Sequence, residues 1–336
     1  MTSSEAPPLH ATERLTPPPG LRTLWLDMGR GMRLRCALAR PARGAARGTV
    51  VILPGRAEYI ERYYETIERL LARRYAVAIL EWRGQGLSTR LTGHPLRGHV
   101  GGFRHYDADL ARFMREVVLP DCPGPLYGWA HSMGATVLLR AAWRRIWFER
   151  ALLVAPMIDL KRRNRPIWWW RLVAATGTYL GLGRLFAPGQ RKRLPCLEDF
   201  TANELTSDEW RYRLQQELLE RHPELCVAGV SLGWLHAAFR AIDSLRAIAG
   251  RHAPPRWPML MALAGDDTVV SGEAAADFAR AVGDISHISI PCARHAIHLE
   301  RDQCQVGLWA AFDSFIGQQG GPDAVMVSQD SIAASS

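Results

Sequence analysis

Short apolar runs alternate with amphipathic segments along most of this chain. The apolar runs, which are typical of buried strands, lie at residues 49–53, 76–81, 126–130 and 151–154. The segments between them have apolar residues at helical spacing and lie at residues 61–73, 106–119 and 133–143. Because only strands buried on both faces can dispense with alternating polar positions, this pattern predicts an α/β fold with a mostly parallel central sheet flanked by helices.

A different pattern precedes these strands. Residues 24–27 and 32–38 are strand-like, and the turn at residues 28–31 contains Gly29 and Gly31. Two such runs joined by a glycine-bearing turn predict an antiparallel β-hairpin, which we expect at the edge of the sheet.

The alternation stops at Pro156 and resumes at residue 259. The resumed pattern predicts strands and helices in turn at residues 259–264, 272–282, 285–290 and 303–316. The segment between is therefore an insertion after the sixth predicted strand, and we interpret it as a helical cap. The predicted organisation is a flexible leader at 1–20, a first core segment at 21–157, the cap at 158–247, a second core segment at 248–317 and a disordered tail at 318–336.

Composition and charge narrow the class of protein. The 336-residue chain is 48% hydrophobic and 22% charged, which is typical of a globular protein. Its formal net charge of +9 suits contact with anionic lipid or nucleic acid, but no zinc-finger, RNA-recognition or helix-turn-helix motif is present, so no nucleic-acid partner is expected. The six cysteines lack metal-ligand spacing and the leader lacks the apolar run of a secretory signal, which predicts reduced thiols and a cytoplasmic location.

The predicted cap contains an unusual basic stretch. Residues 161–193 hold nine Lys or Arg and no acidic residue, with tryptophans at 168–170. Arg171 and Arg184 interrupt the apolar part, which is too short to span a bilayer. Two interpretations remain open at this point: peripheral contact with the anionic inner face of the membrane, or a buried cap helix with solvated arginines.

Candidate chemistry begins with Ser132, which stands between the apolar run 126–130 and the predicted helix at 133–143. This context is that of a nucleophile elbow, where small residues must lie two positions before and after the serine. Ala130 and Gly134 meet that requirement, although Ala130 replaces the usual first glycine. The simpler alternative is an ordinary serine that caps a helix.

A serine nucleophile needs a base, and the base needs an acid that fixes its tautomer. In folds with such an elbow the chain order is serine, acid, histidine, and both later residues follow strands. Asp267 is favoured over Asp266 because it stands just before a Val-Val run. His295 is favoured over His298 because it comes directly after the strand at 285–290.

The oxyanion of an ester intermediate must be met by backbone N–H groups. We expect one donor to be the N–H of Met133 and the other the N–H of Arg56, in the loop after residues 49–53, where Gly55 permits a turn toward the site. Gly55, His131 and Trp234 are further expected to contact the substrate.

With these residues in place, the chain resembles the lysophospholipase L2 family and, more distantly, monoacylglycerol lipases of the serine aminopeptidase S33 group. The resemblance runs from about residue 21 to 317 and rests on Leu-Pro-Gly-Arg at 53–56, Trp-Arg-Gly-Gln-Gly-Leu-Ser at 82–88, Arg-Gly-His-Val at 97–100, Ala-His-Ser-Met-Gly at 130–134 and Ala-Arg-His at 293–295. It implies an α/β-hydrolase fold and a lipid ester substrate, either a lysophospholipid or a monoacylglycerol. It implies no metal or organic cofactor.

Other functions remain alternatives. The same triad could serve a peptidase or a thioesterase, since a fold does not fix a substrate. A catalytically silent protein that binds membrane surfaces through the basic cap is the alternative from another class. The histidines His94, His99 and His105 lack carboxylate companions at ligand spacing, so we expect no metal site there.

Overall fold

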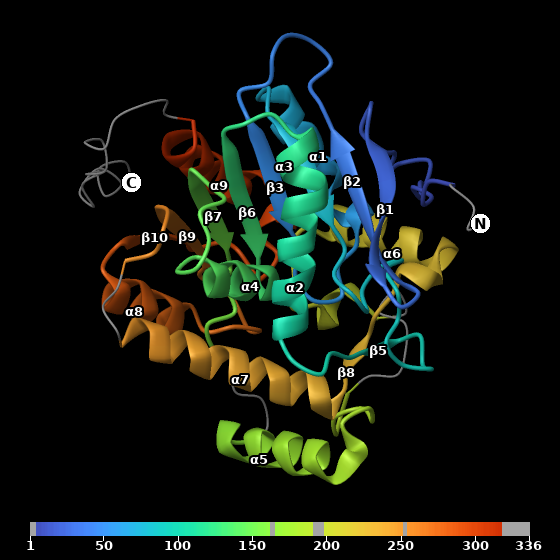
Figure 1. Ribbon diagram of the computed structural model, residues 1–336, viewed down its shortest axis with the longest axis vertical. Helices are drawn as coiled ribbons and strands as arrows, with labels where there is room; N and C mark the ends of the chain where they lie inside the picture. Colours follow the sequence, from blue (N-terminus) through green and yellow to red (C-terminus); the bar gives the residue numbers. More distant parts are fainter. Residues whose placement is uncertain (1–4, 162–164, 191–197, 251–253, 318–336) are drawn as a thin grey trace.

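The structure, a computed structural model, describes residues 5–161, 165–190, 198–250 and 254–317. Its centre is an eight-stranded sheet with the order β1-β2-β4-β3-β6-β7-β9-β10 (Figure 1). Only β2 runs antiparallel to its neighbours, and the other pairs are parallel. The strands are β1 (Arg22–Gly29), β2 (Met32–Ala39), β3 (Thr49–Leu53), β4 (Ala76–Leu80), β6 (Leu126–His131), β7 (Arg150–Val154), β9 (Met259–Ala264) and β10 (Ile285–Ile290).

Helices cover both faces of this sheet. One face packs against α1 (Tyr64–Ala72) and α9 (Asp302–Phe315). The other packs against α2 (Arg104–Phe113), α4 (Met133–Ala141) and α8 (Gly272–Val282). The buried strands β3, β4 and β6 are exposed nowhere along their length, which is why nearly all of their residues are apolar. The predicted α/β fold and the edge hairpin are confirmed.

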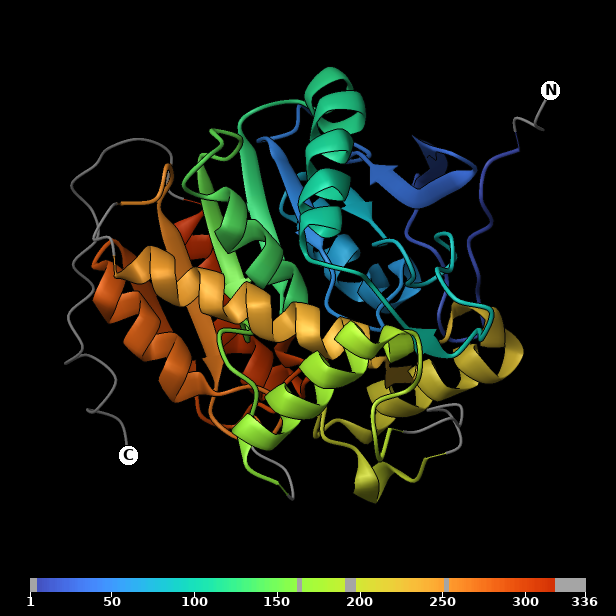
Figure 2. The same ribbon diagram turned by 60° about the horizontal axis from the view of Figure 1, so that its bottom comes forward.

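Between β7 and β9 lie three longer helices: α5 (Ile167–Gly177), α6 (Glu209–Arg221) and α7 (Leu232–Ala249). Helix α7 packs on α4 and α8 of the core, and α5 crosses the outer side of α7 (Figure 2). A short parallel pair, β5 (Arg97–Gly98) with β8 (Gly229–Val230), ties this region to the core. The insertion predicted after the sixth strand of the main sheet is therefore helical.

The leader differs from its prediction. Residues 5–20 have no regular secondary structure, yet they lie against the folded body. The N–H of His10 donates to Oε1 of Glu61 at 3.1 Å, and the hydroxyl of Tyr64 donates to the carbonyl of His10 at 2.9 Å. Arg14 pairs with Glu217 of α6 at 3.0 Å. The expectation of a flexible leader is wrong for these residues, because backbone hydrogen bonds hold a sequence that lacks helical or strand periodicity. The predicted tail at 318–336 lies outside the described residues.

The cysteines require a second correction. Cys292, in the loop after β10, forms a disulfide with Cys304 of α9. The prediction of reduced thiols is therefore wrong for this pair, whose members the fold brings together although their sequence spacing gives no signal. Cys36 and Cys122 are free thiols. Within the described ranges, no helix is long and apolar enough to cross a membrane.

Candidate active site

Ser132 occupies the sharp turn between β6 and α4. Its φ of 49° and ψ of −113° are strained for a residue with a side chain, as expected at a nucleophile elbow. The turn is close to the neighbouring strand: a Cβ at Gly134 would lie 2.2 Å from the carbonyl oxygen of Leu53. Only glycine fits there, whereas Ala130 is fully buried beside Leu53 in the sheet register with its methyl group accommodated.

The three residues predicted as a triad are joined by hydrogen bonds. Nε2 of His295 lies 3.0 Å from Oγ of Ser132, and Nδ1 of His295 lies 2.7 Å from Oδ2 of Asp267. Asp267 follows β9 and His295 follows β10, so both stand at the carboxyl ends of parallel strands, where ligand sites of such sheets form. All three side chains are buried.

Asp267 is fixed on both of its oxygens. Oδ1 accepts hydrogen bonds from the N–H groups of Val269 and Val270 at 2.7 and 2.9 Å. Burial alone would raise the pKa of Asp267, but the hydrogen bond and charge of His295, together with these two N–H groups, hold the pKa below its usual value. An ionised Asp267 accepts the Nδ1 proton of His295 and leaves Nε2 free to accept the proton of Ser132.

The two alternatives to these residues lie elsewhere. The side chain of Asp266 is 70% exposed and approaches Arg294 at 3.8 Å. His298 is buried against the ring of Tyr63, and neither of its nitrogens has a hydrogen-bond partner among the described residues. Burial lowers the pKa of His298 well below its usual value, so the ring is neutral and apart from the serine.

The predicted oxyanion donors lie in residues that line the cavity next to Ser132. Arg56 and Met133 both line the cavity above Ser132. Their N–H groups have no hydrogen-bond partner in the described part of the chain, and are thus available to a ligand oxygen. Gly55 is different: its N–H donates to Oε2 of Glu58 and it does not line the cavity. Its contact with substrate stays a prediction.

Glu58 is a residue of the site that the sequence did not identify. Its buried carboxylate lies 3.0 Å from Nδ1 of His131 and accepts hydrogen bonds from Gly55 and from the hydroxyl of Tyr63. Burial would raise the pKa of Glu58, but the charge and hydrogen bond of His131 and the charge of Arg62 hold it well below its usual value. The carboxylate is therefore ionised.

His131 continues this network toward the catalytic loop. Its Nε2 lies 3.1 Å from the backbone oxygen of His295. Both ring nitrogens thus face an oxygen, so the ring of His131 is held from two sides. The ring of His131 lines the cavity, but both of its nitrogens contact protein oxygens, of Glu58 and of His295. His131 therefore links three parts of the site: the oxyanion loop, the elbow and the His295 loop.

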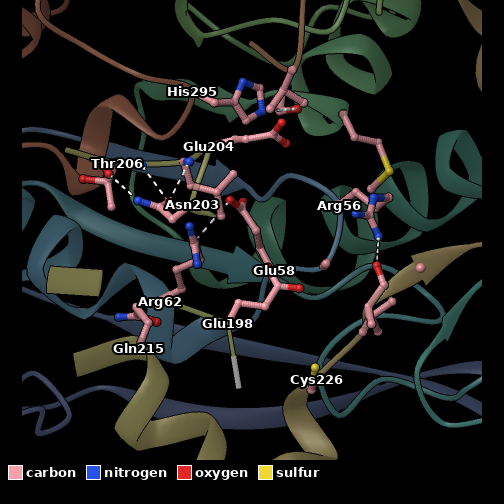
Figure 3. Close-up of a pocket in the computed structure, with 18 of the residues that line it drawn as sticks. Arg56, Glu58, Arg62, Glu198, Asn203, Glu204, Thr206, Gln215, Cys226 and His295 are labelled. Carbon is pink, nitrogen blue, oxygen red and sulfur yellow. Dashed lines mark hydrogen bonds and ion pairs between the residues drawn. The ribbon is translucent and has the colours of Figure 1, made fainter. Parts of the chain in front are cut away.

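The cavity above Ser132 has a volume of about 570 Å³. Core and cap both contribute to its wall (Figure 3). Its apolar lining includes Met133, Met157, Trp170, Leu219, Trp234 and Val270. Its polar lining includes Glu198, Asn203, Glu204 and Gln215, all from the cap. A cavity with this mixed lining can hold an acyl chain together with a polar group.

Arg56 places a cation in this wall. Its Nη1 donates to the carbonyl oxygen of Ala228 at 3.0 Å, and its guanidinium lies 5.8 Å from the centre of the Trp234 ring. Among the described residues, no carboxylate lies within ion-pair distance of it. Trp234 thus lies on the cavity wall, next to a guanidinium for which the described residues offer no acidic partner.

The sheet is open and mostly parallel, and Ser132 stands at a nucleophile elbow. Asp267 and His295 follow later strands. These features define an α/β-hydrolase with a serine hydrolase site. The family model for serine aminopeptidase, S33, matches residues 44–302. The chain belongs to this family.

Two curated relatives are similar over most of the chain. Lysophospholipase L2 of Escherichia coli strain K12 is 31% identical over 280 residues, which cover 79% of each protein. The probable lysophospholipase L2 of Haemophilus influenzae is 23% identical over 300 residues, which cover 88% of this chain and 92% of the relative.

Solved structures show the same fold. A soluble variant of monoglyceride lipase from Saccharomyces cerevisiae superimposes with a TM-score of 0.69 at 19% identity, over 87% of this chain and 94% of that one. A thermostable carboxyl esterase from Bacillus coagulans gives 0.69 at 18% identity, over 89% and 98%.

Proposed function

We propose that this protein is a serine hydrolase that cleaves carboxylic esters of lipids, with lysophospholipids as the preferred substrates and monoacylglycerols as the alternative. The observation that carries the proposal is the hydrogen-bonded line from Ser132 through His295 to Asp267 beneath a cavity of about 570 Å³. The names of the curated relatives and the family membership support the lipid ester class.

In the proposed reaction, Oγ of Ser132 attacks the ester carbonyl carbon while Nε2 of His295 accepts the hydroxyl proton. His295 then gives this proton to the departing alcohol oxygen, and the acyl group stays on Ser132. Water attacks the acyl carbon as His295 takes its proton, which releases the fatty acid and restores the serine. The N–H groups of Arg56 and Met133 stabilise both oxyanions, and each such donor contributes about 3–4 kcal/mol in comparable sites.

The Arg56 side chain supports a phosphate-bearing substrate. A guanidinium binds phosphate oxygens in pairs, and this one lacks a carboxylate partner in the described part of the chain. A lysophospholipid carries a phosphate on the same glycerol as its ester, whereas a monoacylglycerol does not. We therefore assign Arg56 to the headgroup phosphate.

Helix α5 supports contact with a lipid surface. Trp170 of α5 lines the cavity, while Trp168 and Leu172 are exposed on its outer side. Just beyond it, Tyr179 and Leu180 are 78% and 70% exposed. Exposed apolar side chains in a basic segment suit the interface of an anionic membrane. We propose that residues 158–247 act as a cap that takes substrate from such a surface.

The test compares wild type with Ser132→Ala on lysophosphatidylcholine, a monoacylglycerol, an acyl-CoA and an amino-acid naphthylamide. We expect lysophosphatidylcholine to be hydrolysed fastest, and the variant to lose about 10⁴-fold or more in kcat while its circular dichroism is unchanged. A variant that keeps the wild-type rate would refute the nucleophile. Fastest turnover of the naphthylamide or the acyl-CoA would instead make the protein a peptidase or a thioesterase, and no turnover of any substrate would favour a silent binding protein.

A further inference from the structure

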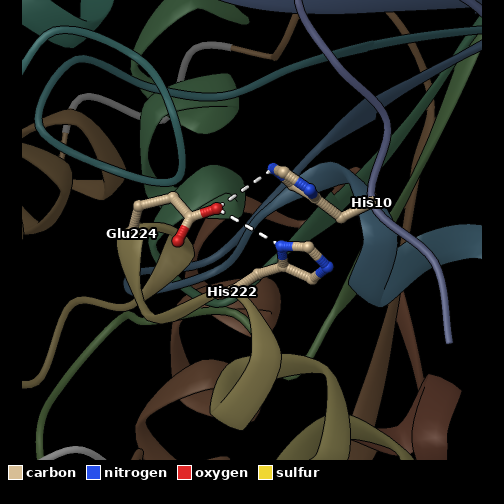
Figure 4. Close-up of side chains that lie close together, drawn as sticks. All are labelled: His10, His222 and Glu224. Atoms are coloured by element: carbon tan, nitrogen blue, oxygen red, sulfur yellow. Dashed lines mark ion pairs between the residues drawn. The ribbon is translucent and has the colours of Figure 1, made fainter.

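Away from the active-site cavity, His10 of the leader meets His222 and Glu224 of the cap (Figure 4). His222 follows the last residue of α6, and Glu224 lies in the single helical turn Pro223–Leu225. One ligand atom from each residue lies within 4.8 Å of the other two. Within the described ranges, no other group of three or more His, Cys, Asp or Glu side chains is arranged so that it could hold a metal ion.

The distances within this cluster show whether its side chains bond directly to one another or are spaced as ligands of one ion. Nε2 of His10 and Nδ1 of His222 each lie 3.4 Å from Oε1 of Glu224. Hydrogen bonds between nitrogen and oxygen usually measure about 2.7–3.2 Å, so these distances are too long for direct bonds. Two ligands that each lie about 2.0–2.1 Å from a tetrahedral zinc ion are about 3.4 Å apart. The spacing therefore fits ligands that share an ion.

The state of His10 agrees with that interpretation. Its Nε2 atom is buried and has no hydrogen-bond partner in the described part of the chain, which is costly for a polar atom unless something binds it.

The backbone on both sides holds the cluster in place. Glu61 and Tyr64 fix the N–H and the carbonyl of His10, and the N–H of His222 donates to the carbonyl of Leu218 at 2.8 Å. The two imidazole rings are stacked, with centres 3.9 Å apart. Because the backbone of both histidines is held, only their rings need to turn apart for the two nitrogens to meet one ion.

We propose that His10, His222 and Glu224 bind one zinc ion, with water as the fourth ligand, and thereby fasten the leader to the cap. Two imidazole nitrogens and one carboxylate oxygen form a ligand set that zinc accepts in a tetrahedral site. Leu219 and Cys226, which flank the two cap ligands in sequence, both line the active-site cavity. The ion therefore braces a cavity wall without touching the reacting atoms.

The test uses the full-length protein, freed of metal with a chelator and then dialysed. Calorimetric titration with zinc chloride should show one ion per chain, and saturating zinc should raise Tm by about 3–5 °C. Cobalt chloride should give the visible absorption of a tetrahedral site. The variants His222→Ala and Glu224→Gln should each weaken zinc binding at least about tenfold. His287→Ala, which removes an exposed histidine from β10, should bind as wild type does.

The proposal is overturned if the wild type takes up no zinc, or if both cap variants bind zinc as tightly as the wild type. Circular dichroism checks that the variants fold, and because Glu224 is partly exposed, Glu224→Gln serves even if His222→Ala is unstable. None of these readouts depends on ester hydrolysis. Failure of the zinc site and failure of the proposed catalytic function are therefore separate results.

Discussion

The floor of the cavity and the outer face of its cap are built in opposite ways. At the floor, the side chains of Ser132, His295 and Asp267 are buried, and hydrogen bonds fix each of them. On the outer face of the cap, Tyr179 and Leu180 are largely exposed to solvent. Under the proposed function, the difference separates two tasks: the buried floor would determine which bond is broken, and the apolar cap would determine which molecule arrives there.

The largest expected effect lies in the floor. Replacing Asp267 by Asn should lower kcat by about 10⁴-fold, because an amide can present an N–H to His295 and stabilise the wrong tautomer. The matched control is Asp266→Asn, one residue away and exposed, which should hydrolyse lysophosphatidylcholine at the wild-type rate. Equal losses in the two variants would mean that the acid has been assigned to the wrong residue.

A smaller loss of activity is expected when the ion pair between Glu58 and His131, next to the floor, is broken. Glu58→Gln removes the buried carboxylate that pairs with His131, which should destabilise the fold by about 3–5 kcal/mol. The oxyanion loop and the His295 loop should also move slightly, with a loss in kcat of about 10–100-fold. Tyr63→Phe, which removes a single hydrogen bond to Glu58, should cost about 1 kcal/mol. Urea denaturation and steady-state kinetics measure both quantities, and an unchanged kcat in Glu58→Gln would show that the network only stabilises the fold.

The same variant has a pH dependence of known sign. The pKa of Glu58 is lower in the folded protein than in the unfolded chain, so its stabilisation is complete above the unfolded pKa and is lost as the pH falls through the folded pKa. Below about pH 4.5, the stability difference between wild type and Glu58→Gln should shrink by about 1.4 kcal/mol per pH unit. Urea midpoints at a series of pH values test this, and a difference independent of pH would contradict an ionised Glu58.

At the boundary between floor and cap, Arg56 tests the headgroup assignment. Arg56→Met keeps the backbone N–H but removes the guanidinium, and should lower kcat/KM for lysophosphatidylcholine by about 10–100-fold. Turnover of a monoacylglycerol should change little. Arg171→Met, which removes an arginine that pairs with Asp243 on the cap surface, is the control. Equal losses on both substrates would assign Arg56 to the fold and not to the phosphate.

The smallest effect is expected on the outer face. Tyr179→Ser and Leu180→Ser should lower turnover of substrate in anionic vesicles a few-fold, because each removes apolar area that can enter the bilayer interface. A soluble ester such as p-nitrophenyl butyrate should be hydrolysed at the wild-type rate. Leu119→Ser, at an exposed leucine of α3 (Leu119–Asp121), is the control. If both cap variants hydrolysed substrate in vesicles at the wild-type rate, the proposed contact between the cap and the membrane would be contradicted.

Much of the core could be predicted from sequence, because its central strands β3, β4 and β6 are buried on both faces and therefore almost wholly apolar. The elbow at Ser132 and the order of Asp267 and His295 could also be predicted, because they depend on local spacing and on the order of residues along the chain. Glu58 could not be found in this way, because its role depends on His131, which the sheet brings close from 73 residues away. The leader was misjudged for a similar reason: its partners Glu61 and Tyr64 lie far along the chain.

The most direct test of Ser132 as the nucleophile is covalent labelling of the wild-type protein with a fluorophosphonate, followed by peptide mapping. A serine activated by His295 and Asp267 should be modified, so we predict a single adduct on Ser132 and none in Ser132→Ala. An unlabelled wild type, or an adduct on another serine that persists in the variant, would contradict the account.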